Sequence, residues 1–395
     1  MVDTAVDGDF TRVRDLLSRV AVSGAYITEQ GTLGRLAEDL YLEAAFGAIA
    51  DAGLDPADVD GVAGLRSDSF SAADARAGFW AEYLDHPVRY FSTVDVASAG
   101  HCAVIMHAAC AIGAGLVDRV VVVGGSSRTT DGRAASVQRL ASAHGEFDVA
   151  WGSLVPSWFA LIAQRHMHEY GTTSEDLARI AVSTRRWASM NESAIMRKPI
   201  TVDDVLGSRM ISSPLHLLDC CLVNDGAGAL VLSRRDLVDD RRPVVTVAGG
   251  AEEYARRAYK DVQHDLLRSG ASHTGPRAMA MAGVGPEDVD VAELYDCFTI
   301  TVLRELEDLG FCKRGEAAGF VADGALEPGG SLPTNTHGGG LSFSHSFSGL
   351  SHAIEAVRQL WGECDERQVP GAETALVHSQ GGPLQLHSTV VLARA

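Results

Sequence analysis

The sequence has no hydrophobic run long enough to cross a membrane. No apolar stretch approaches the roughly 20 residues that a membrane-spanning helix requires. The first ten residues contain three Asp and no Lys or Arg, whereas a secretory signal peptide begins with basic residues. We therefore expect a cytoplasmic protein that has no membrane partner.

Basic residues are also scarce. The chain has 33 Lys and Arg against 52 Asp and Glu, which gives a formal net charge of −19 at pH 7. A surface this acidic repels the phosphates of nucleic acids, so we expect no nucleic-acid partner. The net charge does not exclude a phosphorylated small ligand, because a local basic patch or a helix N-terminus can bind one.

Paired cysteines are missing as well. The seven cysteines are odd in number and scattered, and no two of them form a C-x-x-C pair. This pattern argues against a disulfide framework and against a structural zinc site. His166 and His168 stand two residues apart on a predicted helix and cannot face one ion together, so we predict no metal site.

What the sequence does contain is an internal repeat. Its 395 residues are 46% hydrophobic and 22% charged, a globular composition that suits two or three packed units. The segments ADAGLDPADVDGV (Ala50–Val62) and AMAGVGPEDVDV (Ala280–Val291) share the pattern A-x-A-G-(aliphatic)-x-P-x-D-V-D, 230 positions apart. Each copy predicts the same joint, in which a helix ends at Gly and a turn leads into a strand.

A second, weaker correspondence also indicates two related halves. In each half a predicted helix leads to an apolar strand and a Gly pair, the strands being Val120–Val123 and Ala375–His378. Helices that alternate with short apolar strands are typical of an α/β fold with buried sheets. We predict an N-terminal half over residues 1–240, with an insertion at about residues 126–214, and a C-terminal half over residues 241–395.

Several segments, in their order and spacing, resemble the thiolase superfamily and, within it, the sterol-carrier or lipid-transfer thiolase branch. The resemblance covers nearly the whole chain. The segments are FSTVDVASAGHCAVIMHAA (Phe91–Ala109), HEYGTTSEDLARIAVSTRRWASMN (His168–Asn191), KPITVDDVL (Lys198–Leu206), SPLHLLDCCLVNDGAGALVLS (Ser213–Ser233), ELYDCF (Glu293–Phe298), NTHGGGLSFSHSFSG (Asn335–Gly349) and QLWGE (Gln359–Glu363). The resemblance implies a thiolase fold, with duplicated halves in a five-layer αβαβα arrangement and an inserted loop domain. It also implies a homodimer and acyl-CoA substrates, with coenzyme A as part of the substrate and no tightly bound cofactor.

One departure from the family concerns the nucleophile. Thiolases form an acyl-enzyme on a cysteine thiolate at a helix N-terminus. At the matching position this chain has Ala97, which cannot attack a thioester. Two alternatives stay open: an acyl-CoA acyltransferase that uses another thiol, such as Cys102 or Cys297, and a non-catalytic thiolase-like subunit of a complex.

The resemblance also suggests which other residues line the site. The HDCF motif of lipid-type thiolases reads Tyr295-Asp296-Cys297-Phe298 here, so a phenol replaces an imidazole. His345 fits the histidine of the G-H-P-x-G motif, and Ser379 aligns with the C-terminal acid–base cysteine of other thiolases. A role for His337, which precedes three glycines, is left open. The candidates for the coenzyme A phosphates are Arg128, Arg185, Arg186 and Lys198.

A thiolase-like pocket without its nucleophile still suits aldol chemistry. Cleavage of the Cα–Cβ bond of a 3-hydroxyacyl-CoA needs one group to take the hydroxyl proton and one to protonate the enolate carbon, and we expect Tyr295 and His345 to divide these tasks. The chain also resembles the steroid side-chain acyl-CoA retro-aldolases of actinobacteria, which depend on a tyrosine at the Tyr295 position. Those enzymes carry a second tyrosine where this chain has His345. They work with a small zinc-ribbon and OB-fold partner, and the resemblance implies the same kind of partner here.

Overall fold

The computed structural model describes residues 9–65, 77–94, 96–130, 154–254, 265–381 and 386–395. The strands of its main sheet are β1 (Val20–Ile27), β2 (Gly61–Leu65), β3 (Tyr90–Val94), β4 (Arg119–Ser127), β7 (Asp225–Arg234), β8 (Val245–Tyr254), β9 (Val291–Leu294), β10 (Thr374–Gly381) and β11 (Leu386–Arg394). The helices are α1 (Thr11–Leu17), α2 (Ala37–Asp51), α3 (Ala77–Leu84), α4 (Gly100–Gly113), α7 (Val155–Tyr170), α8 (Ser174–Ser189), α9 (Val202–Leu206), α10 (Ala271–Ala282), α11 (Thr299–Asp308), α12 (Ala317–Ala322) and α13 (Leu350–Trp361). β5 (Met210–Ser212) and β6 (Leu215–His216) form a separate two-stranded sheet.

The strand order shows two related halves. The sheet runs β3-β2-β4-β7-β1-β8-β11-β10-β9, so the order β2-β4-β7-β1 is repeated in reverse as β8-β11-β10-β9. Val120 of β4 lies beside Gly61 of β2, and Ala375 of β10 lies beside Val291 of β9, both in parallel register. The predicted strands therefore occupy equivalent places, each next to the strand that follows one copy of the repeat.

The repeated Asp is the physical reason for the repeat. The Asp60 carboxylate accepts the backbone N–H groups of Asp118 and Arg119 at 3.0 and 3.1 Å, where β4 begins. The Asp290 carboxylate accepts those of Glu373 and Thr374, both at 2.9 Å, where β10 begins. Each copy thus ties the end of its turn to the start of the neighbouring strand.

Both faces of each half of the sheet are buried. In β4, Val120 and Val122 point into the central core, while Val121 and Val123 face the core beneath α2. In β10, Val377 joins the central core and Leu376 joins the core on the opposite side. This alternation explains why the strands read as unbroken apolar runs.

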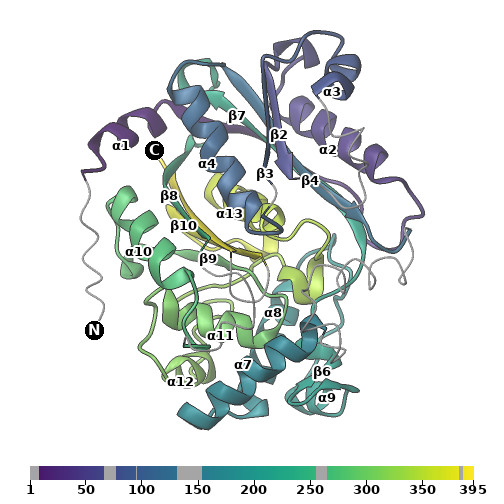
Figure 1. The fold of residues 1–395 in the computed structure, drawn as a ribbon, viewed down its shortest axis with the longest axis vertical. Coiled ribbons are helices and arrows are strands. Elements are labelled where there is room, and N and C mark those ends of the chain that lie inside the picture. Colours follow the sequence, from purple (N-terminus) through teal and green to yellow (C-terminus); the bar gives the residue numbers. More distant parts are fainter. Residues whose placement is uncertain (1–8, 66–76, 95, 131–153, 255–264, 382–385) are drawn as a thin grey trace.

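The layers of the molecule follow from these cores. Helices α4 and α13 pack against strands of both halves and form the middle layer, while α2 covers β1, β4 and β7 on one outer face and α10 covers β8 and β11 on the other. Figure 1 shows α4 and α13 between the strands of the two halves. The predicted arrangement of duplicated halves in five αβαβα layers is confirmed. In addition, β1 and β8 are hydrogen-bonded to each other, so the two halves share one continuous sheet.

An insertion separates β4 from β7, whereas their counterparts β10 and β11 form a hairpin. It contains α7, α8 and α9, and the helices predicted at Trp158–Tyr170 and Ser174–Ser189 match α7 and α8. Figure 1 shows this group at one end of the molecule, beside α11 and α12. The exact limits of the halves and of the insertion stay predictions.

The part of the chain that the structure describes contains no candidate membrane span. None of its helices combines the length and the apolar character that crossing a bilayer requires.

Candidate active site

The position expected to hold a thiolase nucleophile lies between β3 and α4. Ala97 has φ +49°, a left-handed conformation that costs an alanine roughly 1–2 kcal/mol. Its C=O accepts the N–H of Gly100, the first residue of α4, at 3.0 Å. Its methyl group lies against Gly381 at the end of β10, where a β-carbon would approach to 3.1 Å. The bend that presents a nucleophile at the start of a helix is therefore present, and an alanine occupies it.

Tyr295 and His345 meet beside this bend. Tyr295 follows β9 directly, and its backbone N–H donates to the C=O of His378 in β10 at 3.1 Å. The phenol oxygen lies 3.0 Å from Nε2 of His345, although the two residues are 50 positions apart. Ser98, the neighbour of Ala97, acts on the same phenol and lowers its pKa. The structure thus brings together the two residues that the sequence predicted to share the proton transfers.

Ser379 belongs to the same site. This β10 residue is fully buried, and its hydroxyl donates to the backbone C=O of Ser98 at 2.6 Å. Gly349 has φ +97°, and a β-carbon there would come within 2.4 Å of the Ser379 hydroxyl and 3.1 Å of Nδ1 of His101. Close backbone packing at Gly349 therefore holds α4, β10 and the start of α13 together around residue 98.

Arg128 contacts His345 from the other side. It follows the end of β4, and its guanidinium Nη1 lies 3.3 Å from Nδ1 of His345. The backbone N–H of His345 donates to Oδ1 of Asn224 at 3.0 Å, which fixes the loop that carries the imidazole. Sequence reasoning suggested Arg128 as a phosphate ligand, and nothing in the sequence indicated this contact across 217 positions.

Burial determines the protonation of both central groups. It raises the pKa of the Tyr295 phenol well above its usual value, and the thiols of Cys297 and Cys221 add to this effect. Burial, together with the positive charge of Arg128, lowers the pKa of His345 to about 3. At neutral pH the resting site therefore holds a neutral phenol and a neutral imidazole.

The two alternative thiols are poor nucleophiles. Cys102 is fully buried in α4, and burial raises its pKa to about 12. Cys297 is 5% exposed, and burial raises the pKa of its thiol well above the usual value. Because the thiolate is the reactive form, neither cysteine suits acyl transfer at neutral pH.

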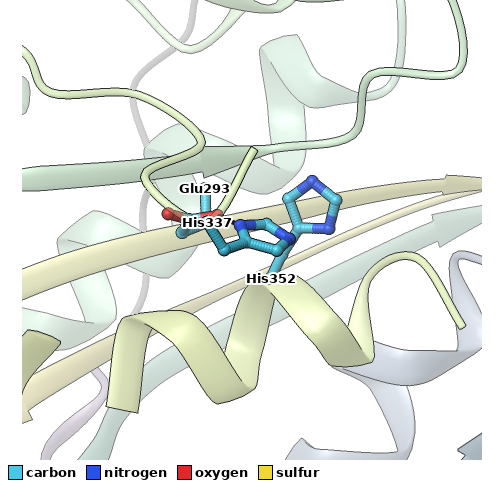
Figure 2. Close-up of side chains that lie close together, drawn as sticks. All are labelled: Glu293, His337 and His352. Carbon is cyan, nitrogen blue, oxygen red and sulfur yellow. Dashed lines mark ion pairs between the residues drawn. The ribbon is translucent and has the colours of Figure 1, made fainter. Parts of the chain in front are cut away.

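His337 lies in a second buried cluster. Its ring packs edge-on against Phe343 and His352, and its Nδ1 stands 3.0 Å from Oε2 of Glu293. Figure 2 shows the His337 ring between Glu293 and His352, which comes from α13. The His337 ring therefore contacts Glu293, Phe343 and His352, whereas Tyr295 contacts His345 and the backbone of His378.

Ligand atoms of Glu293, His337 and His352 in this cluster lie within 4.8 Å of one another, a spacing that could suit a metal ion. Nδ1 of His352 accepts the N–H of Gly349 at 3.1 Å. A neutral imidazole must then carry its hydrogen on Nε2, which faces Asp296 at 3.4 Å. That nitrogen has no lone pair for a cation, so the three residues do not form a ready ligand set, and the absence of a metal site stays a prediction.

The four candidates for the coenzyme A phosphates do not form one cluster. Arg185 is buried, and its guanidinium donates to the Ser342 hydroxyl and to the C=O of Lys198. Arg186 forms an ion pair with Glu327. Lys198 is exposed, and Arg128 faces His345.

Comparison with protein families agrees with this architecture. The model "Thiolase, N-terminal domain" matches residues 20–236, and "Thiolase C-terminal domain-like" matches residues 251–394. The chain belongs to the thiolase family. The predicted resemblance is thus confirmed.

Individual thiolase-family proteins are also similar to the chain. A "Steroid side-chain-cleaving aldolase" from Thermomonospora curvata is 37% identical over 361 residues, which cover 86% of this chain and 90% of that protein. A "17-hydroxy-3-oxo-4-pregnene-20-carboxyl-CoA lyase" from Mycobacterium tuberculosis is 37% identical over 367 residues, which cover 88% and 92% of the two chains. The solved structure "Ltp2-ChsH2(DUF35) aldolase" superposes with a TM-score of 0.85 at 34% identity, covering 96% of this chain and 99% of that one.

Proposed function

We propose that this thiolase-family chain is an acyl-CoA aldolase, a carbon–carbon lyase that cleaves the Cα–Cβ bond of a 3-hydroxyacyl-CoA. The observation that carries the proposal is the pairing of Tyr295 with His345 beside a nucleophile position occupied by Ala97. An alanine there rules out an acyl-enzyme at that position but leaves a site able to move protons. The names of two relatives that are 37% identical, an aldolase and a lyase, support the same reaction class.

The proposed reaction needs no oxidant and no covalent intermediate. The Tyr295 oxygen, as phenolate, takes the proton of the substrate hydroxyl, and the C–O bond becomes a carbonyl. The electrons of the Cα–Cβ bond then form the enolate of the shorter thioester. The phenol returns the proton to Cα and becomes phenolate again, so in this proposal Tyr295 makes both transfers and His345 stabilises the phenolate instead of taking one of the two tasks. Nε2–H of His345 stabilises the phenolate by donating to it, and Ser98 also favours the phenolate because it lowers the pKa of the phenol.

The substrate class is the finer part of the proposal. We infer a branched or steroid side-chain acyl-CoA, from the names of the two relatives. Coenzyme A enters as part of the substrate, and no tightly bound cofactor is required by the proton transfers. Among the basic residues predicted for its phosphates, Lys198 and Arg186 are exposed, and Arg186 already forms an ion pair with Glu327.

The assembly is likewise proposed. We infer a homodimer, as in the thiolase resemblance, that works with a small zinc-ribbon and OB-fold partner. The similar solved structure is named as an aldolase together with a DUF35 component, which supports a partner of this kind.

The test is an assay with the thioester named in the M. tuberculosis relative, 17-hydroxy-3-oxo-4-pregnene-20-carboxyl-CoA. Cleavage between the carbons α and β to its thioester yields a 17-ketosteroid and a three-carbon acyl-CoA, both measurable by mass spectrometry. The protein mass should stay unchanged during turnover, because no acyl-enzyme forms. An acyl adduct on Cys102 or Cys297 would instead establish an acyltransferase.

A further inference from the structure

Arg128 is the charged side chain in hydrogen-bond contact with His345, and its chemistry restricts that histidine. A guanidinium has only N–H donors and stays protonated at every relevant pH. At 3.3 Å from Nη1, Nδ1 of His345 must therefore act as the acceptor. In a neutral imidazole the hydrogen then resides on Nε2, the nitrogen that lies 3.0 Å from the Tyr295 oxygen.

This choice of tautomer determines the direction of the next hydrogen bond. With hydrogen on Nε2, His345 donates to the phenol oxygen, and the phenol's own hydrogen is left to point elsewhere. With hydrogen on Nδ1, Nε2 would accept that phenol hydrogen and hold it away from a substrate. We propose that Arg128 is a positioning residue that fixes the Nε2–H tautomer of His345 and thereby makes Tyr295 a proton donor and its phenolate a stabilised base. The inference rests on the proposed aldolase function and deepens it.

The backbone around Arg128 is held firmly enough for this role. The next residue, Thr129, donates its N–H to Oδ1 of Asp225 at 2.7 Å, and the Thr130 hydroxyl donates to Oδ2 at 2.9 Å. Asp225 is fully buried at the start of β7 and also accepts the N–H of Leu33. The guanidinium is thus carried by a backbone segment that is tied to the sheet.

The other groups around His345 do not compete for Nδ1. Burial is the largest cause of the lowered pKa of His345. The charges of Arg128, His352 and His101 lower this pKa further, and Asp296 raises it. Arg128 is the group whose hydrogen bond is made to Nδ1 itself. Arg128 therefore sets the tautomer of His345, and its positive charge also favours the phenolate of Tyr295.

The experiment compares the full-length wild type with Arg128→Met and Arg128→Lys. Nitrogen-15 NMR of labelled histidine rings, with the His345 signals assigned by their loss in His345→Gln, should show hydrogen on Nε2 in the wild type. Arg128→Met should shift the population toward Nδ1–H and lower kcat by about 10- to 100-fold, the effect expected for losing one charge-assisted hydrogen bond. Arg128→Lys, which keeps a cationic donor, should retain the tautomer and recover part of the activity.

Arg19→Met is the matched control, because this exposed arginine pairs with Asp15 in α1 and should leave tautomer and kcat unchanged. Three results would overturn the proposal: hydrogen on Nδ1 in the wild type, an unchanged tautomer in Arg128→Met, or a rise in KM for the thioester with kcat intact, which would make Arg128 a coenzyme A ligand. If Arg128→Met does not fold, the wild-type and Arg128→Lys spectra still decide the tautomer. Because the spectra need no turnover, an inactive enzyme would count against the aldolase function and not against the tautomer.

Discussion

At the scale of single residues, the site combines one loss with one pairing. Ala97 cannot form an acyl-enzyme, while Tyr295 and His345 lie in direct contact beside it. Of the remaining candidates, Ser379 belongs to the site because its hydroxyl donates to the C=O of Ser98. His337 lies in the separate cluster with Glu293 and His352. The chemistry proposed for this chain therefore depends on one phenol oxygen more than on any thiol.

Removal of that oxygen is the most direct test. Tyr295→Phe should lower the carbon–carbon cleavage rate by about 10²- to 10⁴-fold, since it deletes the proton-transfer group. The loss of one hydrogen bond should lower the free energy of unfolding by only about 1 kcal/mol. Steady-state kinetics and urea unfolding measure the two effects. Tyr254→Phe is the control, because Tyr254 is an exposed tyrosine bonded to Glu252. Full activity in Tyr295→Phe would place the proton transfer on another residue.

The pH dependence follows from the raised pKa of Tyr295. Burial favours the neutral phenol, so the phenolate is the minor form at neutral pH and its fraction grows about tenfold per pH unit. We expect kcat/KM for cleavage to rise with pH between about pH 6 and 9. His345, with its pKa lowered to about 3, should add no change in this range. A flat profile would contradict a phenolate base.

At the scale of the elements, the two copies of the repeat stabilise the fold through equivalent hydrogen bonds. Asp60 and Asp290 each accept two backbone N–H groups at the start of a central strand. Asp60→Ala and Asp290→Ala should each lower the free energy of unfolding by about 1–3 kcal/mol, because two donors lose their acceptor. Urea unfolding measures this, with Glu287→Ala, at an exposed site in the second copy, as a control expected within about 0.5 kcal/mol of wild type. If one substitution lowered the free energy of unfolding strongly and the other did not, the two helix-to-strand joints would not contribute equally to stability.

Local patterns and long-range contacts differ in how far the sequence reveals them. The repeat and the apolar strands are local patterns, so they predicted the helix-to-strand joints and the equivalence of β4 and β10. Only the family resemblance, which carries three-dimensional information, predicted that one site would contain Tyr295, His345 and Ser379. The contact of Arg128 with His345 had no local signal, because it joins the end of a strand in one half to a loop of the other. The hydrogen bonds between β1 and β8 could not be predicted from the sequence either, because the residue pattern of a strand does not specify which strand lies beside it.

At the scale of the whole molecule, we expect the chain to work as part of an assembly. Co-expression with a DUF35 protein, the class that the name of the similar solved aldolase contains, should give a complex that elutes together and cleaves the thioester faster than the chain alone. Size-exclusion chromatography with light scattering should give the chain alone a mass near twice 41.7 kDa. Separate elution together with full activity of the chain alone would argue against a required partner.

The strand order has a consequence for folding of the chain during its synthesis on the ribosome. β11 is synthesised after β8 and β10, yet it lies between them and is hydrogen-bonded to both. Until β11 leaves the exit tunnel, β8 and β10 each expose an unpaired apolar edge, the kind of surface that draws nascent chains into aggregates. The same order holds in the N-terminal half, where β7 is synthesised after β1 and β4 and lies between them, so each half of the sheet is completed only when its last strand is synthesised.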